Sequence, residues 1–362
     1  MKNAFKTVVA LLAVIAVLLC AVVPSFADKG IFDENAIASV IAASDLQDGN
    51  MAFERLEKVM GLMKEDGLND PDSLLIGGDY SKMLPNYAGT EILKVQNAYT
   101  TVFSGEEISS VVCLQGNHDM LPCGGFTKTG FYDMGTYCLY AINENDFPWN
   151  QHLRLSNGIE KVAKNVESAL NGMIEKGDNR PVLIATHVPL HHTTRTNSGD
   201  NMYASYLFNV INQAAEKLDI VFLFGHNHSG GHDNYIGGAV NFMAPGDTIR
   251  VPLADERGED CYTEETLNFT YTNYGYLGYS NNSDENGSTS MLTASVIQIE
   301  ENTLRFIRYS EDGFQWVKEV TRKAPCADAS ARTAALPVVN ESLWRFEQAL
   351  IGFFSKLFAF AA

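Results

Sequence analysis

Positive charge is scarce in this sequence, and no lysine- or arginine-rich run is present. Lys and Arg together number 26 against 44 Asp and Glu, which gives a formal net charge of −18. A strongly negative protein repels the backbone of nucleic acids. We therefore expect no long nucleic acid among the partners. The apolar content of 46% over 362 residues still suffices for a sizeable core in one large domain or two modest ones.

Cysteine is also scarce, with six in the whole sequence. Their spacing matches no zinc-binding module. Cys123 and Cys138 flank a turn-rich segment and are candidates for a disulfide. Five cysteines remain once Cys20 is removed with the N-terminal segment described next. Because five is an odd number, at least one cysteine is left outside any disulfide within the chain. A disulfide scaffold is therefore not expected to hold the protein together.

The first residues have the features of a secretory signal peptide. Lys2 and Lys6 supply a positive start, 8–23 is an apolar run, and 25–27 offers the small residues that a signal peptidase reads. We predict cleavage after Ala27, which makes 1–27 a signal peptide and the chain secreted, either extracellular or associated with the cell envelope. The alternative is an uncleaved membrane anchor, for which the apolar run is short.

The middle of the chain alternates short apolar runs with helical patterns. Strands are predicted at 37–43, 73–76, 109–114, 135–142, 181–186 and 219–224, and helices at 51–64, 90–103, 157–175 and 203–218. Such alternation is typical of a mostly parallel sheet.

Past residue 235 the helical pattern stops. Strands are predicted at 239–243, 266–272, 291–299, 304–309 and 314–320, with polar loops at 247–264 and 278–290. Two sheets packed face to face, each covered by helices, satisfy both halves of the pattern. The predicted fold class is therefore α/β, as a four-layer α/β/β/α sandwich.

Two further segments follow this main domain, which we place at 28–324. Residues 325–340 are rich in alanine and other small residues and are interpreted as a linker. Residues 341–362 have the pattern of an amphipathic helix with large apolar side chains on one face. Such a helix either docks on the main domain or a partner, or lies at a membrane surface.

Polar motifs directly follow five of the predicted strands. In chain order they are Ser44-Asp45-Leu46-Gln47, Gly77-Gly78-Asp79-Tyr80, Gly116-Asn117-His118-Asp119, His187, and Gly225-His226-Asn227-His228. In open α/β sheets, ligands bind outside the carboxyl ends of the strands. Five strand ends that all carry oxygen or imidazole groups therefore indicate one shared site.

The side chains in these motifs suit metal ions. The candidate ligands are Asp45, Gln47, Asp79, Asn117, His187, His226 and His228. Imidazole, carboxylate and amide oxygen without thiolate suit zinc, manganese or iron. The set is too large for one four-coordinate ion, and a carboxylate such as Asp79 can bridge two ions. We predict two divalent or transition metal ions (Mn, Fe or Zn), whose identity the sequence leaves open.

These ordered motifs resemble those of the calcineurin-like metallophosphoesterase superfamily over about residues 36–320. The resemblance implies one metal held by Asp45, Gln47, Asp79 and His228, and a second held by Asp79, Asn117, His187 and His226. It also implies that 28–324 is a metallophosphoesterase catalytic domain in which metal-activated water attacks phosphorus. His118 would then stabilise the transition state or protonate the leaving oxygen, with Asp119 as a candidate to orient it.

The sequence departs from this pattern at three positions. Gln47 stands where the family usually has histidine, and an amide oxygen is a weaker donor than imidazole. Tyr80-Ser81-Lys82 replaces the Asp-Arg-Gly of Ser/Thr protein phosphatases, which argues against protein phosphatase activity. Lys82 also stands where purple acid phosphatases have a tyrosine ligand, which argues against a purple iron centre.

Residues near the motifs are weaker candidates for substrate contact. His191 and His192 follow His187 closely, and Arg195 has the side chain that binds a phosphate with two hydrogen bonds. The alternative for each is a solvated loop residue. The segment 271–279 carries four tyrosines, and is either an aromatic wall of the pocket or a strand and loop surface.

We therefore predict a metal-dependent phosphoric ester hydrolase that acts on phosphomonoesters or phosphodiesters of small size. The competing hypothesis is a catalytically weak or inactive surface or binding protein that retains the fold. Gln47 is the best support for that alternative.

Overall fold

The computed structural model describes residues 30–47, 49–80, 88–103, 111–119, 121, 123–143, 156–190, 204–228, 241–252, 262–278 and 292–323, together with 343, 345–347, 349–351 and 353. The predicted signal peptide and linker lie outside these residues. So do His191, His192 and Arg195.

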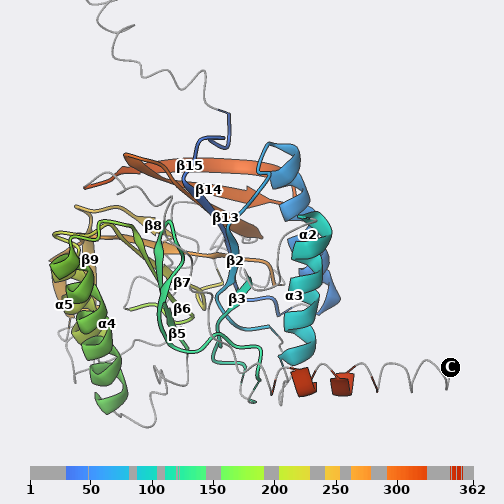
Figure 1. The fold of residues 1–362 in the computed structure, drawn as a ribbon, viewed down its shortest axis with the longest axis horizontal. Helices are drawn as coiled ribbons and strands as arrows, with labels where there is room; N and C mark the ends of the chain where they lie inside the picture. The colour runs from blue at the N-terminus through green and yellow to red at the C-terminus, as the bar shows by residue number, and fades with distance from the viewer. Residues whose placement is uncertain are drawn as a thin grey trace, which may run out of the picture.

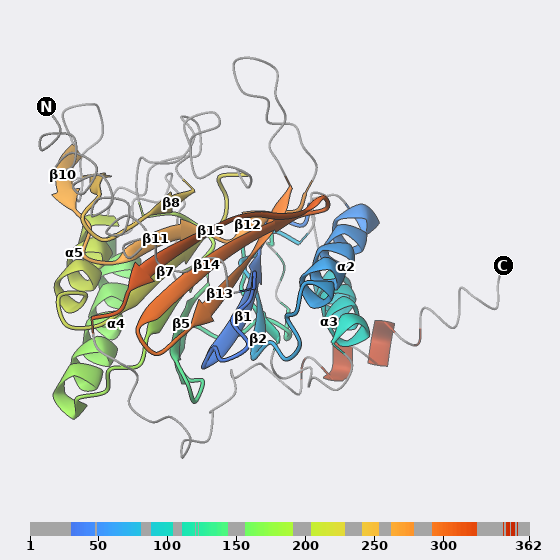
Figure 2. The same ribbon diagram turned by 90° about the horizontal axis from the view of Figure 1, so that it is seen from above.

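Two β-sheets form the centre of the molecule (Figures 1 and 2). The first contains β1 (Ala38–Ala43), β2 (Ser73–Ile76), β3 (Val111–Cys113), β12 (Gly275–Tyr276), β13 (Thr293–Ile299), β14 (Thr303–Ser310) and β15 (Gly313–Thr321). Its order is β15-β14-β13-β1-β2-β3, with β12 paired to β13. Strands β1, β2 and β3 are parallel, and β13 joins them antiparallel to β1.

The second sheet contains β4 (Gly130–Asp133), β5 (Cys138–Ile142), β6 (Val182–Thr186), β7 (Ile220–Phe224), β8 (Phe242–Met243) and β11 (Thr270–Asn273). Its order is β4-β5-β6-β7-β11-β8. Strands β5, β6, β7 and β11 run parallel, with antiparallel strands at both edges. A separate hairpin pairs β9 (Thr248–Pro252) with β10 (Tyr262–Thr266).

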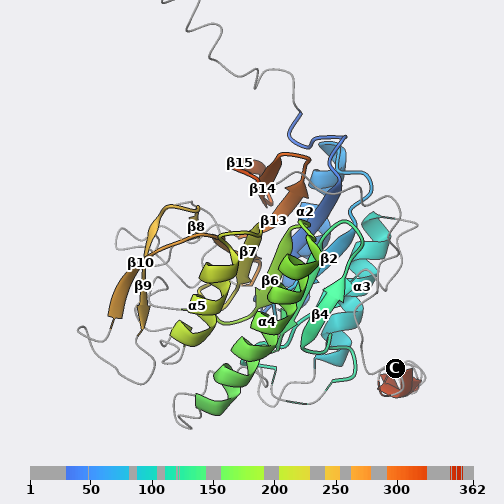
Figure 3. The same ribbon diagram turned by 60° about the vertical axis from the view of Figure 1, so that its left-hand side comes forward.

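Four helices cover the outer faces of the two sheets. Apolar side chains of α2 (Asn50–Glu65) and α3 (Gly89–Val102) share a buried cluster with the first sheet. Those of α4 (Ser156–Lys176) and α5 (Ala204–Ala214) do the same with the second sheet, which they cover in Figure 3. A third cluster, which includes Val40, Leu139 and Ile297, joins the facing sides of the two sheets. The predicted α/β fold is confirmed, and its parallel strands end on one common side.

One predicted loop and one predicted strand are wrong, and one strand was missed. The predicted polar loop at 247–264 contains β9 and the start of β10, and the predicted strand 266–272 is divided between β10 and β11. Strand β4 was not predicted. In β9, Ile249 and Val251 are buried while Arg250 between them is exposed, so the strand alternates over too few residues to stand out from a polar loop.

The candidate disulfide between Cys123 and Cys138 is also wrong. Cys138 is buried in the cluster that joins the second sheet to α4 and α5. Cys123 packs against the cluster under α2 and α3, and its Sγ lies 3.7 Å from Glu347 Oε2. The two thiols therefore belong to different layers of the core.

The C-terminal residues that the structure describes are helical. Glu347 is 7% exposed and its carboxylate accepts hydrogen bonds from the Gly124 backbone N–H at 3.1 and 3.2 Å. Large apolar side chains on this helix face solvent instead, and Phe346 is 61% exposed. Within the described part of the chain, no helix combines the length and apolar character needed to cross a membrane.

Candidate metal centre

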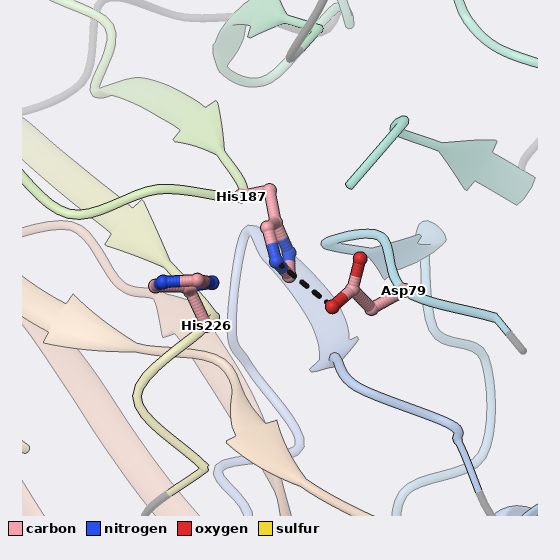
Figure 4. Close-up of side chains that lie close together, drawn as sticks. All are labelled: Asp79, His187 and His226. Atoms are coloured by element: carbon pink, nitrogen blue, oxygen red, sulfur yellow. Dashed lines mark ion pairs between the residues drawn. The ribbon is translucent and has the colours of Figure 1, made fainter. Parts of the chain in front are cut away.

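The predicted ligands come from the carboxyl ends of strands in both sheets. Asp45 follows β1, Asp79 follows β2 and Asn117 follows β3 in the first sheet, whereas His187 follows β6 and the histidine pair follows β7 in the second. Because these parallel strands end on the same side, their loops meet across the gap between the sheets. Figure 4 shows Asp79, His187 and His226 converging there.

One group of ligand atoms gathers around His187, and we call it the histidine cluster. Asp79, His187 and His226 each offer a ligand atom within 4.8 Å of the others. Asn117 Oδ1 lies 3.0 Å from His187 Nε2 and 3.0 Å from His226 Nδ1. The two imidazole rings meet edge to face, with centroids 5.4 Å apart.

The tautomer of His187 follows from its surroundings. Its Nδ1 lies 2.8 Å from the Gly77 carbonyl oxygen, which can only accept, so Nδ1 carries the proton. In the neutral ring Nε2 is then an acceptor, yet it faces Asp79 Oδ2 at 3.3 Å and Asn117 Oδ1 at 3.0 Å. With the Asn117 amide in this orientation three acceptors converge, and a cation would satisfy them, either a second proton on His187 or a metal ion. The backbone partner on the opposite nitrogen is the usual arrangement of a metal-binding histidine.

A second group, which we call the carboxylate cluster, consists of Asp45, Asp79 and His228. Asp45 Oδ2 is held by the Ser44 hydroxyl at 2.7 Å and by the His226 backbone N–H at 3.1 Å. Asp45 Oδ1 is buried and accepts no hydrogen bond from the described residues, although His228 Nε2 lies 3.1 Å away. A buried carboxylate oxygen without a hydrogen bond is costly, and a metal ion would satisfy it.

Gln47 lies beside this cluster but points its nitrogen at it. Gln47 Nε2 donates to Asp79 Oδ2 at 2.6 Å. This orientation of the amide is assigned from the hydrogen-bond network. The shared carboxylate Asp79 therefore faces an amide donor on one side and His187 on the other.

The backbone supports the site at an energetic cost. The residues that the structure describes include four non-glycine residues with positive φ, namely Asp45, Asp79, His226 and His228. Left-handed conformations of this kind cost about 1–3 kcal/mol each and concentrate at functional sites. All four are predicted metal ligands, so the strain is an independent indication that this is a functional site.

Two glycines let the motif loops pack against one another. A Cβ on Gly225 would lie 2.1 Å from Ser44 Oγ, and one on Gly116 would lie 2.3 Å from Asp79 Oδ1. Any side chain at these two positions would therefore push the neighbouring ligand loops apart.

Burial and charge set the protonation of the carboxylates. Burial raises the pKa of Asp45, but the nearby His228 and His187 outweigh it and hold the net pKa below its ordinary value. Burial also raises the pKa of Asp79, but the nearby His187 outweighs this effect and the net pKa lies below its ordinary value. For Asp119 burial dominates, the charge of Asp79 adds to it, and the pKa rises to about 7.

Asp119 ties together the second and third motifs. Its carboxylate accepts hydrogen bonds from the backbone N–H groups of Asp79, Tyr80 and Gly116 at 2.8, 3.1 and 2.9 Å. His118 is half-buried, and its backbone N–H donates to Asp79 Oδ1 at 2.8 Å. The proposed catalytic roles of His118 and Asp119 stay predictions, and the observed contacts of Asp119 are with the backbone that positions Asp79.

Several residues of the site were not predicted as such. Ser44 and the Gly77 carbonyl hold two ligands, and the Tyr276 ring stacks on His228 with centroids 4.9 Å apart. Ser44 belongs to the first polar motif and Tyr276 to the tyrosine-rich segment, but neither was predicted to support a ligand. A backbone carbonyl leaves no signal at all.

Comparisons with known proteins give a family for this chain. A family model described as calcineurin-like phosphoesterase matches residues 38–230. Among solved structures, the chain is similar to a predicted phosphoesterase from Streptococcus pneumoniae, with 11% identity, coverage of 79% of this chain and 98% of that one, and a TM-score of 0.35. It is similar to a dimetal phosphatase from Danio rerio, with 10% identity, coverage of 79% and 99%, and a TM-score of 0.43.

A third similar structure is GAP50, described as the anchor in the inner membrane complex of Plasmodium, with 12% identity, coverage of 80% of this chain and 90% of that one, and a TM-score of 0.49. No curated protein matches the sequence. The family model spans more than half of the 362 residues and includes every predicted ligand. The chain belongs to the calcineurin-like phosphoesterase family.

Proposed function

We propose that this protein is a secreted phosphoesterase that uses two metal ions to hydrolyse small phosphomonoesters or phosphodiesters. The observation that carries the proposal is the convergence of acceptor atoms on His187 Nε2, next to the buried Asp45 Oδ1 that accepts no hydrogen bond from the described residues. The two ligand clusters share Asp79, as a bridged pair of ions requires.

The residues of the two clusters and His118 would each have a distinct part in this reaction. The histidine cluster and the carboxylate cluster would each hold one ion, and Asp79 would touch both. When bound, the ions supply Lewis acidity and a nucleophile from water. His118 stands at the half-buried edge of the site, where it can donate a proton to the leaving oxygen or stabilise the charge that develops on the phosphoryl group.

The test is an assay of the purified chain with added Mn²⁺ and chromogenic mono- and bis-aryl phosphates. We expect hydrolysis, and we expect His118→Ala to lower kcat by about 100-fold or more, because general acids contribute roughly 10²–10⁴-fold. Metal content should stay near that of the unmodified chain. His152→Ala is the matched control, since His152 lies in none of the motifs. An unimpaired His118→Ala would exclude the role given to His118.

A second candidate function is a binding protein that kept the fold with little or no catalysis. The observation that favours it is Gln47, which directs Nε2 rather than Oε1 toward Asp79. Metal analysis separates the two hypotheses. Fewer than one transition metal bound per chain after reconstitution would contradict the enzyme and leave the binding protein.

Export and surface association belong to the same proposal. The basic start, apolar run and small residues of 1–27 support export. The outward-facing apolar side chains around Phe346 support contact of the C-terminal helix with a membrane surface, while the buried Glu347 supports its docking on the catalytic domain. Fractionation of the producing cells, with N-terminal sequencing of the exported chain, tests both. An intact Met1 in the mature protein would contradict cleavage.

A further inference from the structure

Arg308 is buried in β14, and no carboxylate pairs with it among the residues that the structure describes. Its side chain is 1% exposed, and Nη2 donates to Asn273 through the backbone oxygen at 3.2 Å and through Oδ1 at 2.8 Å. Nε and Nη1 have no hydrogen-bond partner in the part of the chain that the structure describes. The guanidinium also lies 5.1 Å from the centroid of the Trp316 ring. A buried cation without a counter-charge is unfavourable for stability, so its presence here indicates a role other than stabilisation.

The guanidinium fixes the direction of a chain of amides. Because arginine only donates, Asn273 must turn Oδ1 toward Arg308 and Nδ2 away from it. That Nδ2 donates to Asn241 Oδ1 at 2.7 Å and lies 3.4 Å from Asn227 Oδ1. Asn227 Nδ2 in turn lies 3.4 Å from Asn241 Oδ1. All three asparagines are buried, and their orientation follows from the one group that cannot accept.

The row of hydrogen-bonded amides ends at the loop that carries His226 and His228. Asn227 stands between His226 and His228, both of which have left-handed backbone. The loop is closed by the Asn227 backbone N–H, which donates to Gly225 O at 2.7 Å. Strained residues persist only where the surrounding structure holds them. The side chain of Asn227 connects this loop to the amide network through its contacts with Asn273 and Asn241.

We propose that Arg308, Asn273, Asn241 and Asn227 form a positioning network that holds the His226–His228 loop in its metal-binding conformation. The network connects a strand of the first sheet to a ligand loop of the second, and none of its members is a ligand itself. The inference rests on the proposed metal centre, but it concerns metal affinity and does not depend on hydrolysis. Outer-shell partners of metal ligands typically change metal affinity by about 10–100-fold.

The alternative is that Arg308 serves only the stability of the fold, and the two roles predict different measurements. Arg308→Met removes the donor and the unpaired charge while keeping much of the volume. A positioning role predicts that the apo protein keeps its Tm or gains, because a buried unpaired charge is replaced by an apolar side chain. Metal binding should weaken at the same time by about tenfold or more. A purely structural role predicts that the Tm of the apo protein and the metal affinity fall together.

Arg305 provides the matched control on the same strand. It is also buried, but its Nε pairs with Glu319 at 3.1 Å and Glu300 at 3.5 Å, away from the amide network. Arg305→Met should lower the Tm of the apo protein, because it leaves those carboxylates without their cation. It should leave metal affinity unchanged.

The experiment titrates the chelator-treated full chain with Co²⁺ and follows the visible spectrum, with the Tm of each apo protein measured separately. Asn273→Asp is the second variant. It gives Arg308 a counter-charge but removes the Nδ2 donor, so Tm should hold or rise while Co²⁺ affinity falls. Arg308→Lys, which keeps the charge and one donor, should recover part of the affinity.

Unchanged Co²⁺ affinity in both Arg308→Met and Asn273→Asp would overturn the proposal. An equal loss of affinity in Arg305→Met would overturn it as well. If Arg308→Met does not fold, Asn273→Asp alone decides, because it retains the arginine. A chain that binds two Co²⁺ ions with the expected variant pattern but hydrolyses no phosphoester contradicts only the proposed function.

Discussion

The two ligand clusters share Asp79 but differ in how their amide side chain is turned. In the histidine cluster, Asn117 presents Oδ1 to both His187 and His226 at 3.0 Å. Beside the carboxylate cluster, Gln47 presents Nε2 to Asp79 Oδ2 at 2.6 Å. An amide oxygen can bind a metal ion, whereas an amide NH₂ cannot. With the amides in these orientations, the histidine cluster offers four candidate ligands, and the carboxylate cluster offers three together with a hydrogen bond from Gln47.

Two metal sites that share a carboxylate can therefore differ in affinity. Gln47 stands where a metal ligand is expected, but its Nε2 donates a hydrogen bond to the shared carboxylate of Asp79. The histidine cluster also has the better outer support, because His187 Nδ1 is fixed by the Gly77 carbonyl oxygen. We expect one tightly bound ion in the histidine cluster and one exchangeable ion in the carboxylate cluster.

The largest effect should come from Asp79, because it belongs to both clusters. Asp79→Asn removes the bridging charge, so both ions should be lost together and phosphoester hydrolysis should fall by more than about 100-fold, the upper range for outer-shell partners. Elemental analysis of the reconstituted variant measures this. Retention of one ion at full occupancy would show that Asp79 belongs to a single cluster.

Single histidine variants should affect the two clusters unequally. His187→Ala should remove the tight ion and, with it, most activity at any metal concentration. His228→Ala should weaken only the exchangeable ion, so that millimolar Mn²⁺ restores part of the rate. Activity measured against Mn²⁺ concentration distinguishes them. Equal responses of the two variants would contradict the inequality of the sites.

The position of this site was predictable from the sequence because its residues follow strands that end together. The motifs containing Asp45, Asp79 and His187 each come after a short apolar run, and parallel strands bring such ends to one edge without further information. The same argument accounts for the correct placement of β1, β2 and β6. Parallel strands with both faces buried consist of continuous apolar residues, which stand out in a sequence.

Features set by long-range contact were not predictable. The direction of the Gln47 amide depends on Asp79, and the tautomer of His187 depends on a backbone carbonyl 110 residues away. Arg308 lies in a strand whose alternating pattern gives no sign of a link to His226. Strand β9 was missed for a local reason, since its two buried residues flank an exposed arginine and form too short a pattern.

Gln47→His should make the two clusters alike. Imidazole is a stronger ligand than an amide, so the exchangeable ion should bind about tenfold tighter. Gln47→Leu is the control that tests the orientation of the side chain. If Gln47 only donates to Asp79, Gln47→Leu should leave the metal affinity of the weaker site within about threefold of the original. A loss as large as that of His228→Ala would show that Gln47 is itself a ligand.

The smallest expected effect concerns Ser44, which holds the carboxylate cluster from behind. Its hydroxyl donates to Asp45 Oδ2 at 2.7 Å and shares that oxygen with the His226 backbone N–H. Ser44→Ala removes one of two hydrogen bonds, worth about 0.5–1.5 kcal/mol net. The weaker ion should therefore lose roughly threefold to tenfold in affinity, while the ion in the histidine cluster keeps its own. Competition with a calibrated chelator measures the two constants separately. An equal loss at both sites would mean that Ser44 supports the shared ligand Asp79 and not Asp45 alone, and would remove the distinction between the two clusters.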